Sequence, residues 1–262
     1  YYNENDRWAG FVEDTSRINE SELVFYNPGL RVELPDEEYV GKQLEWIEKL
    51  FLNHYSRELL KKKMVKKVIL AKNVTYCRRL GNNILSEQER DYFNNIANTL
   101  IFSHGDASVE NLANEDMLEM KNDLHTWMLT EKLVDDYPMA ELEDFLSVTD
   151  YSKTLSADYY EEWVSEGWLG RLANSEEEAK RTDVRTYLEM IITTPKEILE
   201  IDVNSVSRQD PLFWVIRNYD YAGFLHPSKD VAGNIKKKYD LIVAAFKDWG
   251  VDLPAIGDLY YE

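Results

Sequence analysis

Four segments of the chain carry apolar residues at intervals of three and four, the spacing that gathers them on one face of a helix. These segments span about 38–60, 114–134, 175–192 and 230–248. Two of their ends also carry helix signals: Ser175 with Glu178 forms a capping-box pattern, and Gly250 follows the last segment. The pattern predicts a mostly helical chain.

Strand patterns are fewer and shorter. The sequences "VILA" at 68–71 and "NTLIFS" at 98–103 predict two short strands, the first of them buried. The sequence "ELVFYNPGLRVEL" at 22–34 has β-rich residues on both sides of Asn27-Pro28-Gly29, which is a turn signal. We therefore expect a hairpin there.

The remaining stretches are polar. Residues 73–98 favour a loop with a short helix at about 86–96, and the stretch from about 200 to 228 favours a loop. Together the elements predict an α+β fold with a mostly helical C-terminal half. We expect a lead-in and hairpin over 1–36 and a single compact domain over 37–262.

Charge narrows the function classes. The chain has 49 acidic and 30 basic residues, a net charge of −19, with 44% hydrophobic and 13% aromatic residues. The apolar content indicates a globular core. A surface this acidic repels phosphate backbones and anionic lipid headgroups, so nucleic acid is not expected as a partner. The simplest role of the charge is solubility.

Cysteine content and hydropathy set further limits. Cys77 is the only cysteine, which excludes an intrachain disulfide and a Cys-rich metal site. No apolar run approaches the roughly 18–20 residues of a membrane-spanning helix. The chain begins with Tyr1 rather than Met, which is compatible with removal of a leader or tether.

The search for chemistry leaves one helix. Gly-rich phosphate loops, G-x-S-x-G and calcium-loop patterns are absent from the sequence. His104 and Asp106, two residues apart after a predicted strand, are of types that ligate metals, although a polar turn explains them as well. What remains is the helix at about 114–134, which contains His125.

That helix can be compared with the zinc motif H-E-x-x-H. In the motif, residues i and i+4 project from one side of a helix and bind Zn²⁺, while the glutamate acts as general base. The segment ending at His125 reads Lys-Asn-Asp-Leu-His, so only the second histidine is present. A lysine ammonium does not ligate zinc, and an asparagine amide does not accept a proton from water. The residues alone argue against a working zinc site.

The order of segments nevertheless resembles a family of zinc-binding metallopeptidases from Bacteroidetes, lipoproteins associated with outer-membrane nutrient import. The resemblance begins at "LEWIEKLFLNHYSRELLKKKMVKKVILA" (44–71) and continues through the helix at 117–138. It extends over "EGWLGRLANSEEEAKRTDVRTYLEMI" (166–191) and "IKKKYDLIVAAFKDWGVDLPAI" (235–256). Order and spacing carry the resemblance more than any single motif.

The resemblance implies a zincin-like fold: a small twisted sheet, an active-site helix and a helical C-terminal half. It places Lys121 at the first zinc histidine, Asn122 at the general base and His125 at the second histidine. Glu189 matches the glutamate of the family's acidic D-F-x-E motif, in which Thr186 replaces the aspartate. Because the chain departs from the family at these positions, catalysis is not implied. We expect the Lys121 ammonium to take the place of the metal and pair with Glu189.

Two functions remain as hypotheses. The first is a metallopeptidase-like lipoprotein of the cell envelope, anchored to the outer membrane and catalytically inactive, with no metal or other cofactor. It would bind a peptide, a glycan or components of the import system. Its candidate binding residues are Glu189, Tyr159, Tyr160, Trp163 and Trp168. Packing in the core is the simpler role of the aromatic ones.

The second hypothesis is an active zinc metallopeptidase with displaced ligands, His125, His104 and Glu189. It requires His104 to fold close to His125. A third possibility is that the resemblance arose by chance and that the chain is an unrelated helical interaction protein.

Overall fold

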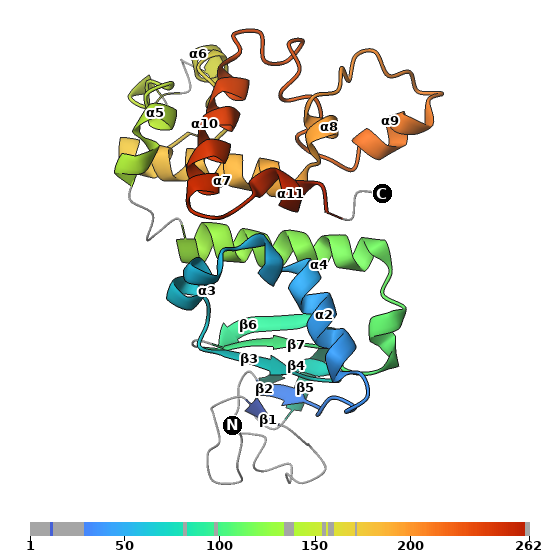
Figure 1. Cartoon of the computed structure of the whole chain (residues 1–262). Helices are drawn as coiled ribbons and strands as arrows, with labels where there is room; N and C mark the ends of the chain where they lie inside the picture. Colours follow the sequence, from blue (N-terminus) through green and yellow to red (C-terminus); the bar gives the residue numbers. More distant parts are fainter. Residues whose placement is uncertain are drawn as a thin grey trace. The chain divides into compact units, whose positions relative to one another are not determined.

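The computed structural model of the chain describes residues 11–12, 29–80, 83–96, 99–133, 139–153, 156, 160–170 and 172–259. The chain divides into two compact units, the first made of residues 1–50 and 64–120 and the second of residues 51–63 and 121–262 (Figure 1). The single domain expected over 37–262 remains a prediction. Within the described part of the chain, no helix is both long and apolar enough to cross a membrane.

The first unit contains a mixed four-stranded sheet. Strand β1 (Phe11–Val12) runs parallel to β2 (Gly29–Val32), which pairs antiparallel with β4 (Val74–Leu80). Strand β4 pairs antiparallel with β5 (Asn83–Arg90) at the other edge. The inward residues of this sheet form an apolar cluster with neighbouring segments: Leu30, Val32, Ala71, Val74 and Ile101.

A second, three-stranded sheet belongs to the same unit. Strand β7 (Thr99–Phe102) lies between β3 (Lys67–Leu70), to which it is parallel, and β6 (Tyr92–Ile96), to which it is antiparallel. All four residues of β7 are buried, which explains their continuous apolar sequence. The two predicted strands are thus confirmed, but the expectation that the first is buried is wrong, because Val68 is 43% exposed and Ile69 and Leu70 are only partly buried. The mixture of strands and helices confirms the α+β class.

The expectation of a loop with a short helix between these strands is wrong. Strands β4, β5 and β6 occupy most of that stretch. Strand β5 lies at a sheet edge and exposes Glu87, Gln88 and Glu89, so its polar sequence is that of a solvated edge strand. Polarity was therefore a poor guide to secondary structure here.

The predicted hairpin at 22–34 lies largely outside the described residues. Its second half is present as β2, and the antiparallel partner of β2 within the described chain is β4. Residues 13–28, which include the expected first strand and most of the turn, are not described.

Helix α2 (Val40–Leu50) is joined to the ends of β3 and β7 by one side chain. The Nε2 of the buried Gln43 donates to the carbonyl oxygens of Ala71 (3.0 Å), Phe102 (3.2 Å) and Ser103 (2.6 Å). These carbonyls follow or end the two parallel strands. Those of Phe102 and Ala71 also accept from the backbone N–H groups of Ala71 and Gly105, so the Gln43 amide adds a second donor where these strand ends meet α2. A short 3-10 helix, η3 (Ala107–Glu110), precedes α4.

The second unit is helical in its described residues. Its segment before the sheet strands contains η2 (Leu52–His54) and α3 (Arg57–Lys63). Helix α4 (Asn114–Thr126) starts in the first unit and continues as the π-helix η4 (Trp127–Leu133). The remaining helices are η6 (Met139–Leu142), α5 (Glu143–Leu146), α6 (Tyr160–Ser165), α7 (Glu176–Thr193), α8 (Lys196–Leu199), α9 (Pro211–Ile216), α10 (Asn234–Asp248) and α11 (Leu253–Gly257).

Most long helices fall where the apolar spacing predicts them. Helix α4 with η4 covers the predicted 114–134, and the Oγ of Ser175 caps α7 by accepting from the backbone N–H of Glu178 at 3.2 Å. Helix α10 is followed by Gly250, whose φ of +83° is the left-handed conformation that favours glycine. The short helices α9 and α11 were not predicted.

The first predicted helix, 38–60, is interrupted after Leu50. Phe51 leaves the helical conformation, and Tyr55 is extended and forms a β-bridge with Val251. A new helix then starts at Ser56, whose Oγ accepts from the N–H of Leu59 at 3.3 Å. The apolar spacing could not show this break, because the residues after it return to a similar helical period.

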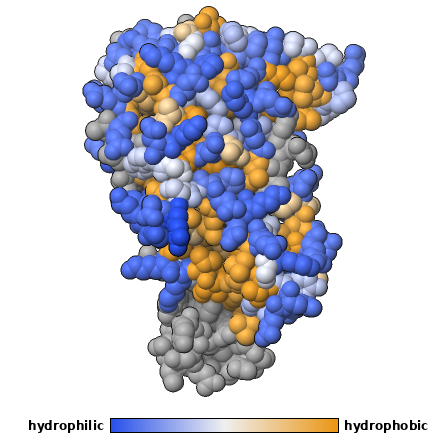
Figure 2. Space-filling view, in the orientation of Figure 1, coloured by the Kyte–Doolittle hydropathy of each residue, from blue (hydrophilic) through white to orange (hydrophobic). Residues whose placement is uncertain are grey.

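One face of the molecule is mainly hydrophilic in its described residues (Figure 2). In the space-filling view, hydrophilic groups cover most of this face, and hydrophobic groups form smaller patches between them (Figure 2). This distribution agrees with the net charge of −19 as a solubility feature.

Candidate functional site

The helix that contains the motif-like positions is packed as a core helix. Met120, Leu124 and Met128 are buried along one face, as their spacing predicts. The helix widens to π geometry from Trp127, and the Oγ1 of Thr130 donates to the carbonyl of Thr126 at 2.7 Å. The question is which contacts the Lys121, Asn122 and His125 side chains make.

Lys121 is fully buried. Its Nζ donates to the carbonyl oxygen of Ile192, near the end of α7, at 2.8 Å. Burial lowers the pKa of Lys121 to about 7, and the negative charge of Asp258 opposes this shift only in part. Lysine thus satisfies a helix-end carbonyl in an environment that does not favour its charge.

The expected ion pair between Lys121 and Glu189 is not formed. Glu189 is exposed on α7, and no carboxylate of the described residues forms an ion pair with Lys121. The prediction placed the two residues on facing elements correctly, but the residue of α7 that meets Lys121 is one turn farther along and contributes its backbone.

His125 is also fully buried, among aromatic rings. Its Nδ1 lies 2.6 Å from the hydroxyl of Tyr55, and the two rings are stacked at 25°. The rings of Phe51 and His54 meet it edge to face. Burial raises the pKa of Tyr55, which keeps its hydroxyl protonated and able to donate.

Asn122, at the position of the general base, has its Oδ1 buried without a hydrogen-bond partner within the described part of the chain. An amide oxygen does not take up a proton at neutral pH, so this atom can accept a hydrogen bond but cannot act as a general base.

His104 belongs to the first unit and has partners of its own. Its Nε2 lies 2.8 Å from Asp91 Oδ1 and its Nδ1 lies 3.1 Å from the hydroxyl of Ser108. The hydrogen bond to His104 lowers the pKa of Asp91. Asp106 caps η3 by accepting from the backbone N–H of Ser108 at 2.9 Å. The Ser108 hydroxyl, and after it this backbone N–H, lower the pKa of Asp106. The polar-turn interpretation of this segment therefore accounts for both side chains.

These residues do not fit a zinc ion. The Nζ of Lys121 donates to the carbonyl of Ile192, the Nδ1 of His125 faces Tyr55, and both ring nitrogens of His104 have neighbours. Among the described residues, no group of three or more His, Cys, Asp and Glu side chains is arranged to hold a metal.

The aromatic residues proposed for ligand binding lie around α6. Tyr159 is outside the described residues, and Tyr160 begins α6 without a described side chain. Trp163 and Trp168 are buried, with exposed fractions of 4% and 1%, and pack edge to face. The Nε1 of Trp163 donates to the carbonyl of Lys153 at 2.7 Å. Both tryptophans belong to an apolar cluster with Tyr151, Ala173 and Ala179.

The same two tryptophans also line a pocket of the second unit, with a volume of about 380 Å³. The walls come from α6, the following loop, the segment before α10 and the start of α10, which lie side by side (Figure 1). The lining residues are Trp163, Val164, Trp168, Leu169, Gly170, Phe224, Lys229 and Ile235. We define this as the Trp163/Trp168 pocket.

The loop that forms one wall is held by three successive carbonyl groups. The carbonyl of Ser165 accepts from Asn234 Nδ2 (2.7 Å), that of Glu166 from Thr149 Oγ1 (2.9 Å), and that of Gly167 from the Tyr187 hydroxyl (2.6 Å). Each donor comes from a different segment of the chain. The loop is therefore fixed before any ligand arrives.

Two glycines allow this loop its path. Gly167 has a φ of +79°, and a Cβ there would lie 3.0 Å from the backbone of Asn234. At Gly170 a Cβ would lie 2.5 Å from the ring of Trp168. The glycines thus let the chain pass against α10 and against the indole.

A buried ion pair lies behind the loop. Lys238 of α10 pairs with Asp183 of α7, and the Lys238 Nζ also donates to Thr149 Oγ1 at 2.8 Å. Asp183 accepts from the Tyr151 hydroxyl at 2.5 Å. Burial raises the pKa of Asp183 and lowers that of Lys238, while their mutual attraction opposes both shifts. Through Thr149 this network reaches the pocket loop.

Family models, curated proteins and solved structures give no significant match to the chain.

Sequence reasoning missed Lys229, Lys238 and Asp183. A signal existed for Lys238, which stands three residues after the buried Ile235, within the apolar stripe of α10. A charged residue on such a stripe indicates a buried partner. For Lys229 no periodic signal exists, because it lies in a loop before the helix.

Proposed function

We propose that the chain is a catalytically inactive, zincin-like lipoprotein of the cell envelope that acts as a binding or accessory protein of an outer-membrane nutrient-import system. The resemblance in segment order supports the fold and the cellular role. The single observation that carries the inactive assignment is the buried Lys121 side chain at the position of the first zinc ligand, with its Nζ donating to the carbonyl of Ile192.

The chemistry at Lys121 supports loss of the zinc site rather than a zinc site with displaced ligands. A Zn²⁺ ion next to Lys121 would require the lysine to be neutral and to give up its bond to the Ile192 carbonyl. The stacking and hydrogen bond with Tyr55 give His125 a structural role that does not depend on metal. A binding function instead needs a preformed pocket, and the Trp163/Trp168 pocket meets that requirement.

Elemental analysis of protein purified without chelators tests the proposal. We expect zinc far below one atom per chain and no hydrolysis of a casein or peptide-library substrate. Stoichiometric zinc that is lost in a His125→Ala variant, together with proteolysis, would overturn the proposal in favour of a peptidase with displaced ligands.

A further inference from the structure

The Trp163/Trp168 pocket combines an apolar lining with one cation. Of the eight lining residues that the structure describes, seven offer carbon surface and Lys229 is the one that carries a charge. The described lining side chains add two indole N–H groups. The Nε1 of Trp163 already donates to the carbonyl of Lys153, whereas the Nε1 of Trp168 is a buried donor without a hydrogen-bond partner in the described chain. All of these groups are donors, so the side chains of the described lining residues offer no strong acceptor.

The Lys229 ammonium has hydrogen-bond donors that can serve a ligand. An ammonium carries three N–H donors. The Lys229 Nζ gives one to the carbonyl of Ala222 at 2.8 Å and lies 4.4 Å from the ring centre of Phe224. Within the described part of the chain no carboxylate pairs with it, although the chain carries 49 acidic residues. Partial burial lowers its pKa, as expected for a cation that lacks an anionic neighbour.

The lining argues against the more polar ligands. A sugar or a peptide backbone presents several hydroxyl or amide groups, each of which needs a partner when it leaves water. The described lining side chains offer N–H donors only, so the hydroxyl and amide donors of such a ligand would find no side-chain acceptor among them. An apolar chain or ring with one acidic group places its carbon surface against the tryptophans and its charge at the lysine.

We propose that the Trp163/Trp168 pocket binds a small apolar carboxylate, with the carboxylate at Lys229 and the hydrocarbon part against Trp163, Trp168 and Phe224. The volume of about 380 Å³ lies within the range of about 300–1,000 Å³ for small-molecule sites. Val164, which is 39% exposed on α6, also lines the pocket, so part of the lining is open to solvent. This inference rests on the binding function proposed above and names its ligand class.

Isothermal titration with octanoate, 1-octanol and octylammonium tests the pocket, because the three probes share a chain and differ in the head group. We expect octanoate to bind about tenfold more tightly than 1-octanol, as a charge-assisted hydrogen bond provides. Octylammonium is expected to bind more weakly than both. The octanoate affinity should fall with rising salt.

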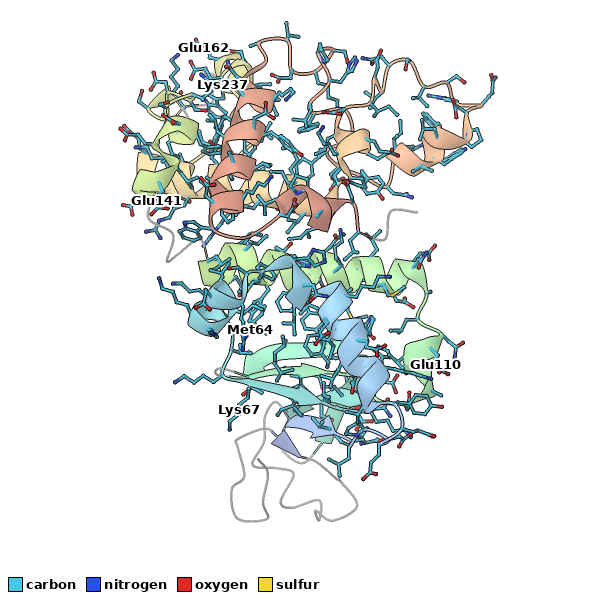
Figure 3. All side chains as sticks on the ribbon, viewed as in Figure 1. Met64, Lys67, Glu110, Glu141, Glu162 and Lys237 are labelled. Atoms are coloured by element: carbon cyan, nitrogen blue, oxygen red, sulfur yellow. The ribbon has the colours of Figure 1, made fainter. Side chains whose placement is uncertain are left out.

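Variants of Lys229 separate the charge from the carbon surface. Lys229→Met should reduce octanoate affinity about tenfold and leave 1-octanol binding unchanged, whereas Lys229→Arg should keep the preference for the carboxylate. Lys237→Met is the matched control. Lys237 is exposed on α10 and does not line the pocket (Figure 3). Its loss should change none of the three affinities.

The inference and the proposed function fail in different ways. Zinc content and proteolysis would overturn the proposed function and leave octanoate binding in place. Absence of octanoate binding, a preference for 1-octanol, equal loss in the Lys237→Met control, or tighter binding of maltose or trialanine would overturn the pocket assignment. These results would leave the metal-free state untouched.

Discussion

Lys121 occupies the position that the resemblance assigns to a zinc ligand, and its side chain is fully buried. A buried lysine with a pKa of about 7 gains a proton on unfolding at neutral pH, since its pKa in the unfolded chain is about 10.4. The unfolded state then binds more protons between these two values. We expect the free energy of unfolding to rise with pH above 7, with a slope approaching about 1.4 kcal/mol per pH unit from this group.

Urea unfolding at pH 7, 8 and 9 measures this slope, and the Lys121→Met variant isolates it. The variant removes the titrating group and retains the length of the side chain, so its stability should depend less on pH than that of the original chain. Lys237→Met, which removes an exposed lysine, should retain the full slope. An identical slope in the original chain and in Lys121→Met would show that Lys121 stays protonated in the folded state.

Trp163 tests the balance between packing and ligand contact. Its indole is 4% exposed and its Nε1 is hydrogen-bonded, so truncation creates a cavity and removes a hydrogen bond. Trp163→Ala is expected to lower the free energy of unfolding by about 3–5 kcal/mol. Trp163→Phe should lose less, because it fills part of the volume. Thermal and urea unfolding measure both, and an unchanged stability in Trp163→Ala would indicate a surface platform instead of a core residue.

Between elements, Lys238 on α10 and Asp183 on α7 form an ion pair in which both side chains are fully buried. Lys238→Met leaves the carboxyl of Asp183 buried without a countercharge, which is expected to cost about 3–5 kcal/mol. Because burial already raises the pKa of Asp183, the variant should regain stability as pH falls from 7 towards 5 and the carboxyl takes up a proton.

The double variant Lys238→Met, Asp183→Asn is the matched control for this link. It removes both charges and should be more stable at pH 7 than Lys238→Met alone. It should also lose the extra pH dependence. If the double variant is no more stable than Lys238→Met, the loss of stability comes from altered packing around Lys238 and not from the unpaired charge.

The sequence predicts the helical elements better than the sheets, for a physical reason. Helix α10 and the α4 segment bury one face over several turns, so their spacing repeats often enough to be recognised. Strand β5 buries little and presents charges at an edge, so its polar sequence does not separate it from a loop. The break after α2 depends on Tyr55 pairing with Val251, a contact distant in sequence.

The candidate site was predictable only in part. The sequence identified Lys121, His125, Trp163 and Trp168 as residues of interest, and each of them is buried. Their partners were not predictable, since Ile192 contributes a backbone carbonyl and no side chain. The pocket itself arises where two stretches distant in sequence, 163–170 and 224–235, meet, which no local pattern records.

At the scale of the whole molecule, neither compact unit is a continuous stretch of the sequence. Residues 51–63 belong to the second unit although residues on both sides of them belong to the first. This segment supplies Phe51, which is fully buried, and Tyr55, which contacts His125 and bridges to Val251. A single cut in the chain therefore cannot separate the two units.

This arrangement predicts how fragments of the protein behave. The fragment 121–262 alone lacks the two aromatic rings, each worth roughly 1.5–3 kcal/mol of burial, and leaves the Nδ1 of His125 without its tyrosine. We expect it to unfold without a cooperative transition. The same fragment with residues 51–63 joined to its N-terminus by a flexible glycine-serine linker should unfold cooperatively, as followed by near-ultraviolet circular dichroism during heating. A linked segment of scrambled sequence provides the control. Equal cooperativity in the bare and the linked fragment would mean that residues 51–63 are not an integral part of the second unit.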